Sequence, residues 1–204
     1  MKPARRLPAL FASTLLLAWP AVVPAATTPN AHPSFNCARV EAKSVPALVC
    51  HDAGLAALDR NLAKVYAEAV RKTPEQQPAT LRSRQREWIR ERDACRHRHD
   101  IHACVDAAYR HRIVELQARY ALVDAIGPVR YACDDDGGEF AATYYKTEPP
   151  SLIAEHGDAS ALMLVARSAS GAKYEGPQGM LWEHQGEATI RWGSGAPELH
   201  CVKQ

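Results

Sequence analysis

Apolar side chains in the first half of the chain recur every three or four positions. The first run consists of Leu55, Leu58, Leu62, Val65, Tyr66, Ala69 and Val70. This spacing places the run on one face of a helix, which follows the polar pair His51-Asp52 and ends at Thr73-Pro74. A second helix is predicted over about 79–96, and a third begins near residue 103. Their apolar members are Leu81, Trp88 and Ile89, then Val105, Tyr109, Ile113, Leu116 and Tyr120.

The pattern changes after Pro128 to short β-prone runs separated by turn residues. The runs are 130–133, 140–145, 151–154, 162–165, 180–182, 188–192 and 199–202. Glycine, proline and aspartate fall between them, which is typical of a compact antiparallel sheet or barrel. We therefore expect an α+β protein with two domains, over residues 36–121 and 131–204, joined by a linker at 122–130.

The first residues predict export. Lys2, Arg5 and Arg6 precede a mostly apolar stretch over 7–23, and Ala25-Ala26 follow it, so residues 1–26 have the organisation of a signal peptide. The stretch is short and interrupted, and the first cysteine, Cys37, lies well beyond it. We expect a periplasmic or secreted protein that is soluble after cleavage and has no stable membrane anchor.

Export favours disulfide formation for the six cysteines. Local pairing is the simplest arrangement, although sequence alone leaves other connectivities open: Cys37 with Cys50, Cys95 with Cys104, and Cys133 with Cys201. An alternative is a zinc site made by Cys95, Cys104 and three intervening histidines, His97, His99 and His102. Oxidation of the two thiols is the preferred interpretation, so we expect no metal and no cofactor.

Charge divides the chain at the same boundary. Residues 27–130 carry 17 Lys and Arg against 12 Asp and Glu, whereas residues 131–204 carry 5 against 11. The basic half includes Arg82, Arg84, Arg86, Arg90, Arg92, Arg96 and Arg98. Export argues against nucleic acid as the partner of these arginines. Two interpretations remain: the arginines form a solvated helix surface, or they contact anionic polymers of the cell envelope.

The helical half contains a set of motifs in a recognisable order: Asn36-Cys37-Ala38, Cys50 with 55–59, Gln85-Arg86-Glu87-Trp88, Arg92-Asp93-Ala94-Cys95, and Cys104 with Tyr109 and Arg112-Ile113. With these motifs, residues 36–121 resemble the N-terminal domain of the LprI-like lysozyme inhibitor family. This resemblance implies a small cysteine-stapled helical fold. It says little about activity.

The second half contains three further features: Tyr131-Ala132-Cys133 with Cys201, the run 168–174, and Leu181-Trp182 followed by Glu187-Ala188-Thr189. Together they resemble the MliC family of c-type lysozyme inhibitors, whose fold is a small antiparallel β-barrel. The resemblance implies that the run enters the lysozyme active-site cleft, with Ser170 contacting the catalytic carboxyl groups and Gly171 allowing a close backbone approach. The implied lysozyme-binding residues are Ser168, Ser170, Gly171, Lys173, Tyr174 and His184.

His184 marks a departure from that family. Counting from Trp182 to Glu187 without gaps, His184 occupies the position of a lysine that accompanies the serine in the family. A protonated His184 could replace its charge, Gln185 could donate a neutral hydrogen bond, and Lys173 is a second candidate cation.

The leading hypothesis is a non-catalytic inhibitor that protects peptidoglycan from host c-type lysozyme, with the acidic second half attracting a basic enzyme. The alternative is a cell-envelope binding or scaffolding module whose primary site lies on the helical domain. An enzyme is disfavoured because the chain has no Gly-x-Ser-x-Gly motif. The oligomeric state is open.

Overall fold

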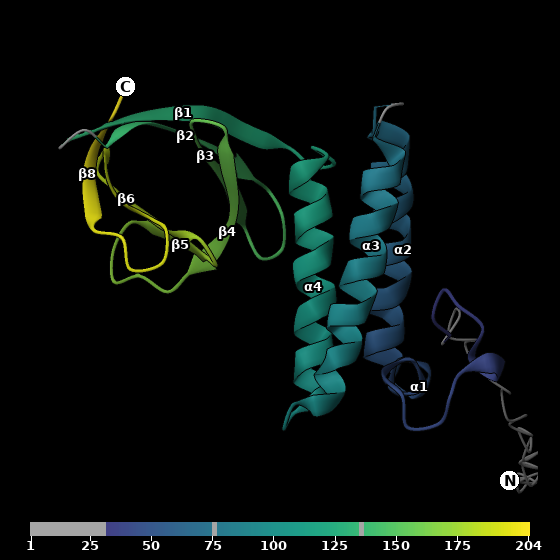
Figure 1. Ribbon diagram of the computed structural model, residues 1–204. Coiled ribbons are helices and arrows are strands. Elements are labelled where there is room, and N and C mark those ends of the chain that lie inside the picture. Colours follow the sequence, from purple (N-terminus) through teal and green to yellow (C-terminus); the bar gives the residue numbers. More distant parts are fainter. Residues whose placement is uncertain (1–31, 75–76, 135–136) are drawn as a thin grey trace, which may run out of the picture.

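The computed structural model describes residues 32–74, 77–134 and 137–204, which form a helical domain followed by a β-barrel (Figure 1). The predicted α+β class and the two types of domain are thereby confirmed. The signal peptide predicted for residues 1–26 lies outside the described residues. In the described part of the chain, no helix has both the length and the apolar character needed to cross a membrane.

The helical domain is built on three long helices, α2 (Ala53–Lys72), α3 (Pro78–Asp93) and α4 (Ile101–Arg119), with the short helices η1 (Cys37–Arg39), α1 (Val45–His51) and η2 (Ala94–His97) among its described residues. The predicted polar start and stop of α2 are confirmed. The Asp52 carboxylate accepts a hydrogen bond from the Leu55 amide at 2.8 Å, and the Thr73 hydroxyl donates to the Ala69 carbonyl at 2.7 Å. The short helix α1 was not predicted, because Pro46 suggests a break in helical structure. Proline is nevertheless compatible with the first turn of a helix, where Pro46 lies.

Four of the residues that carry the resemblance of the helical half meet in its core. The Tyr109 hydroxyl donates to Asp59 Oδ1 at 2.9 Å, and Arg92 Nη1 donates to the same hydroxyl at 2.8 Å. The Trp88 ring packs edge-on against Tyr109, with centroids 5.3 Å apart. Burial raises the pKa of Tyr109, so this tyrosine stays a neutral donor. These side chains join α2, α3 and α4 through one buried polar network.

All three predicted disulfides are confirmed: Cys37–Cys50, Cys95–Cys104 and Cys133–Cys201. The Cys95–Cys104 bridge joins η2 to α4 and uses both thiols of the alternative zinc site. His102, from the same segment, is exposed and lies 3.1 Å from the Asp52 carboxylate. The cysteines of this segment therefore have a structural role.

The second domain is a closed barrel in which each strand pairs antiparallel with the next and β8 returns to β1. Its strands are β1 (Ala125–Cys133), β2 (Gly138–Tyr145), β3 (Ser151–His156), β4 (Ala159–Ala166), β5 (Ala172–Gly176), β6 (Gly179–His184), β7 (Glu187–Trp192) and β8 (Glu198–Lys203). The fully buried interior includes Phe140, Leu152 and Ile190. Cys133 and Cys201 are direct register partners, so their disulfide lies across the seam that closes the barrel.

Two details differ from the sequence-based expectation. Strand β5 (Ala172–Gly176) includes the last three residues of the run 168–174, where we expected no strand, because serine, glycine and alanine give this segment little β signal. Strand β1 begins at Ala125 rather than near residue 130, so part of the expected linker lies in the sheet. Gly127-Pro128 interrupts the pairing of β1 with β2, and such residues usually mark the end of a strand.

Helix α4 packs on both domains and lies between them (Figure 1). Val114 and Ala118 are 0% and 1% exposed, although neither belongs to the core shared by α2, α3 and α4. Glu115, from the same side of α4, lines a small cavity together with Ala161 and Leu162 of β4. The apolar residues around α4 thus serve two packing surfaces, and the domains are in direct contact.

Candidate functional site: a loop held against strand β6

The loop between β4 and β5, residues 167–171, is exposed throughout. Its two serines form a local turn: the Ser168 hydroxyl donates to the Ser170 carbonyl, and the Ser170 amide donates back to Ser168 Oγ at 3.3 Å. Serine commonly stabilises turns in this way. The loop is therefore internally ordered.

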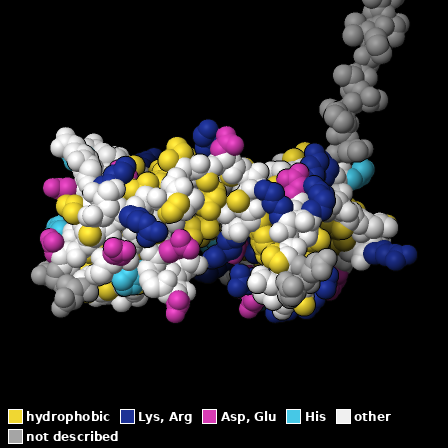
Figure 2. All heavy atoms as spheres, turned by 90° about the horizontal axis from the view of Figure 1, so that it is seen from above, with side chains coloured by type: hydrophobic (Ala, Val, Ile, Leu, Met, Phe, Trp, Pro, Cys, Tyr) yellow, Lys and Arg dark blue, Asp and Glu magenta, His cyan; other side chains and the backbone are white. Residues whose placement is uncertain are grey.

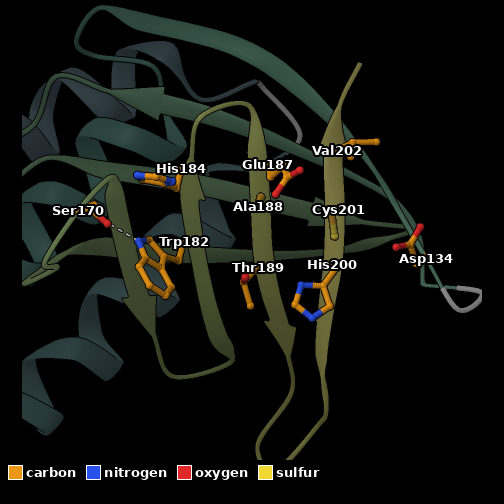
Figure 3. Close-up of a pocket in the computed structure, with 10 residues that line it drawn as sticks. All are labelled: Asp134, Ser170, Trp182, His184, Glu187, Ala188, Thr189, His200, Cys201 and Val202. Atoms are coloured by element: carbon orange, nitrogen blue, oxygen red, sulfur yellow. Dashed lines mark hydrogen bonds between the residues drawn. The ribbon is translucent and has the colours of Figure 1, made fainter.

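Trp182 ties this loop to the barrel. Trp182 lies on β6, and its indole Nε1 donates a hydrogen bond to the Ser170 carbonyl oxygen in the loop at 2.8 Å (Figure 3). Gly171 has φ of +65°, and a Cβ atom placed there would collide with the Glu183 carbonyl oxygen and lie 3.1 Å from His184 Cβ. Only glycine allows this approach without displacing backbone. The loop backbone lies directly on the end of β6.

The structure brings some of the predicted binding residues together and separates others. Ser170 and His184 line one surface cavity of about 420 Å³. Lys173 lies on β5 directly opposite Trp182, and its ammonium group pairs with Glu175 at 2.6 Å. Tyr174 belongs to the barrel interior: its ring packs edge-on against Tyr144, with centroids 5.5 Å apart. The exposed loop thus contributes Ser168, Ser170 and Gly171, while Tyr174 supports it from inside.

A buried polar cluster holds β6 from the other side. The hydroxyls of Tyr131 and Tyr144 each donate to Glu183 Oε2 at 2.9 Å and lie 2.8 Å from each other. Burial raises the pKa of both tyrosines above the usual value, and the neighbouring Glu183 adds to the effect. Because side chains alternate along a strand, Glu183 points inward while Trp182 and His184 face outward.

Sequence reasoning missed three residues that share the cavity with Ser170 and His184: Glu187 and Thr189 on β7, and His200 on β8 (Figure 3). Alternation within each run could have indicated that Glu187 and Thr189 share a face. Only the strand register shows that Thr189 is the direct neighbour of both Trp182 and His200. Among the described residues, no group of His, Cys, Asp and Glu is arranged to hold a metal ion.

The opposite charges of the two halves are visible on the surface. Figure 2 shows Lys and Arg side chains gathered on the helical domain, beside a barrel with many Asp and Glu side chains. The loop and the cavity belong to the acidic barrel, for which a basic partner is electrostatically favoured.

Comparison with known proteins matches each half to a family. Residues 131–199 match the family described as membrane-bound lysozyme-inhibitor of c-type lysozyme, MliC. Residues 37–116 match the family described as lysozyme inhibitor LprI. Among solved structures, Pseudomonas aeruginosa MliC in complex with hen egg white lysozyme is similar, with 23% identity and a TM-score of 0.32; the match covers 40% of this chain and 86% of that one.

Relatives that span both domains exist in mycobacteria. Lipoprotein LprI of Mycobacterium bovis and lipoprotein LprI of Mycobacterium tuberculosis are each 34% identical to this chain over 184 residues. Each match covers 89% of this chain and 91% of the relative. With identity at this level over nearly the whole length, and with an LprI-type helical domain followed by an MliC-type barrel, this chain belongs to the LprI family.

Proposed function

We propose that this protein is a non-catalytic inhibitor of c-type lysozyme that acts in the periplasm or outside the cell after removal of residues 1–26. The loop at 167–171 enters the active-site cleft of the enzyme and blocks access to peptidoglycan. Support comes from the two family matches, both to lysozyme inhibitors, and from the acidity of the barrel, since c-type lysozymes are generally basic.

The hydrogen bond from Trp182 to the Ser170 carbonyl carries this proposal. It fixes the backbone of the loop while leaving the Ser170 hydroxyl, which makes no hydrogen bond to any described residue, exposed beside the cavity. A loop that is ordered before binding loses less conformational entropy when a partner surrounds it. This arrangement favours insertion into a cleft over the role of an ordinary hairpin connection.

The chemistry suits the proposed target. Lysozyme uses two carboxyl groups, one protonated and one ionised, on either side of the scissile bond. The Ser170 hydroxyl can accept a hydrogen bond from the first or donate one to the second. His184, which lines the same cavity, can place a positive charge near the ionised carboxylate when it is protonated. Occupation of both groups would leave no room for substrate.

A cell-wall lysis assay with purified protein and hen egg white lysozyme tests the function. We expect dose-dependent inhibition, weakened at least severalfold by Ser170→Ala. Ser194→Ala is the matched control, because Ser194 is also exposed but lies in the turn between β7 and β8. Undiminished lysis at a large excess of the wild-type protein would reject the proposal.

A second candidate function is envelope binding by the helical domain, and one observation favours it. Arg82, Arg86 and Arg90 are exposed at intervals of four along α3 and make no ion pair with described residues, so they form a basic stripe on one helix face. Cosedimentation of the full chain with isolated peptidoglycan, with and without glutamine at these three positions, tests this function. Equal cosedimentation of both forms would exclude the stripe as the binding site.

A further inference from the structure

The outer face of the barrel beside the loop carries a row of side chains that crosses four strands. Each member is the direct register partner of the next, from β5 to β8: Lys173, Trp182, Thr189 and His200. The residues that alternate with them on β6 and β7, Leu181 and Ile190, are buried inside the barrel. The row therefore points to solvent on one continuous surface.

A groove follows this surface and begins at the loop. The cavity of about 420 Å³ is lined by Ser170 at one end and by Thr189 and His200 farther along. Figure 3 shows its lining residues spread from the loop across β6, β7 and β8. A partner that meets Ser170 consequently meets this groove as well.

The groove offers groups that suit a positively charged side chain. Glu187 is the first residue of β7, is exposed, and makes no ion pair with described residues. Trp182 is 37% exposed, and its indole is the best aromatic acceptor for a cation. Thr189, between them on the lining, adds a hydroxyl. A guanidinium or ammonium group can pair with the carboxylate and lie over the indole.

The size of a stable interface gives a second reason to include this groove. Stable protein complexes bury about 800 Å² on each partner and involve roughly 20–30 residues a side. The loop at 167–171 is far smaller than that, so additional barrel surface must contact the enzyme. The groove is continuous with the loop, concave and acidic at Glu187, whereas c-type lysozymes are generally basic.

We propose that the groove over β6, β7 and β8 is a second contact site for the lysozyme and receives an arginine or lysine side chain from the rim of its active-site cleft. Glu187 pairs with that cation, and Trp182 and Thr189 line its path. This inference rests on the proposed inhibitory function and identifies further residues that determine affinity for the enzyme.

The dissociation constant for hen egg white lysozyme, measured by titration calorimetry with the full chain, tests the groove. Glu187→Gln should weaken binding about three- to tenfold, and raising the salt concentration should shrink the difference. Glu155→Gln is the charge-matched control, because Glu155 is exposed on β3, which lies opposite β7 in the ring of strands. This control should bind like the wild type.

Comparison with Ser170→Ala separates the two proposals. If Ser170→Ala weakens binding and Glu187→Gln behaves like Glu155→Gln, the groove is not a contact site, while the inhibitory loop stands. If the wild-type protein does not bind the enzyme at all, both proposals fail. A Thr189→Lys variant adds a bulky cation inside the groove and should weaken binding further than Glu187→Gln; unchanged affinity would overturn the groove.

Discussion

The indole N–H of Trp182 donates a hydrogen bond to the carbonyl oxygen of Ser170, 2.8 Å away, and so joins a strand of the barrel to an exposed loop twelve residues earlier. The two residues are farther apart in the sequence than the partners of an ordinary turn. The bond therefore fixes the position of the loop relative to the barrel. Its contribution to binding can be measured separately from folding.

Trp182→Phe removes the donor but keeps an aromatic ring on β6. Loss of one hydrogen bond of this kind costs about 1 kcal/mol, so the dissociation constant for lysozyme should rise roughly fivefold. Thermal unfolding followed by circular dichroism should shift by only a few degrees, since one hydrogen bond to an exposed loop is lost and the buried residues of the barrel are unchanged. Unaltered affinity would mean that the loop keeps its position without this bond.

Gly171→Ala should damage binding more than an equivalent change elsewhere. Both Gly171 and Gly195 have positive φ, +65° and +73°, but a Cβ atom at Gly171 meets the Glu183 carbonyl whereas nothing lies within 4 Å of one at Gly195. Gly195→Ala therefore reports the backbone strain alone, about 1 kcal/mol. We expect Gly171→Ala to lose much more inhibition than Gly195→Ala in the lysis assay. Similar losses would show that contact with β6 is unimportant.

His184→Lys should strengthen inhibition at neutral pH, because it supplies a fixed positive charge beside Ser170. The lysis assay at pH 7.5 compares the two proteins directly. Equal or weaker inhibition by the lysine variant would show that a positive charge at this position does not assist the loop.

Removal of the Cys133–Cys201 disulfide should destabilise the barrel strongly. The bridge closes a segment of 68 residues, for which restriction of the unfolded chain contributes about 4 kcal/mol, against about 3 kcal/mol for the 13-residue segment of Cys37–Cys50. Each cysteine pair can be replaced by serine, and the loss in free energy of unfolding measured by chemical denaturation. The loss should be larger for Cys133–Cys201 than for Cys37–Cys50. A larger effect at Cys37–Cys50 would contradict it.

Alkaline pH should destabilise the barrel. The pKa values of Tyr131 and Tyr144 are raised in the folded protein, so above about pH 10 the unfolded chain loses protons that the folded chain retains. The stabilisation from these tyrosines is therefore complete below pH 10 and is lost as the pH rises further. Denaturant unfolding at pH 8 and pH 10.5 should show a drop that is smaller in Tyr144→Phe, measured against wild type at each pH.

The helices and the disulfides were predictable because their determinants are local. Leu55, Leu62 and Val65 repeat at helical spacing, and Asp52 caps the helix that they begin. The cysteine pairs followed from order along the chain, since each lies within one compact domain. The turn residues likewise marked most barrel strands, because glycine and proline act on their own segment of backbone.

The site was only partly predictable. Ser170, Gly171 and His184 were identified through resemblance to a family, and the structure places them together at the end of β6. Tyr174 was assigned to the loop, but pairing of β5 with β6 turns its ring into the barrel. The sequence of this segment does not predict that orientation. An alternating pattern shows which side chains share a face of a strand, but it does not show which face lies inside the barrel.

Local sequence signals are enough to give the order of elements, the helical faces, the covalent bridges and the charge of each half. Only the folded barrel shows which side chains meet: Trp182 with the Ser170 carbonyl, Thr189 with His200, and Glu183 with two tyrosines. These contacts depend on strand register and on closure of the barrel. Both are set by pairing between distant segments, where a shift of one residue would exchange the inner and outer faces.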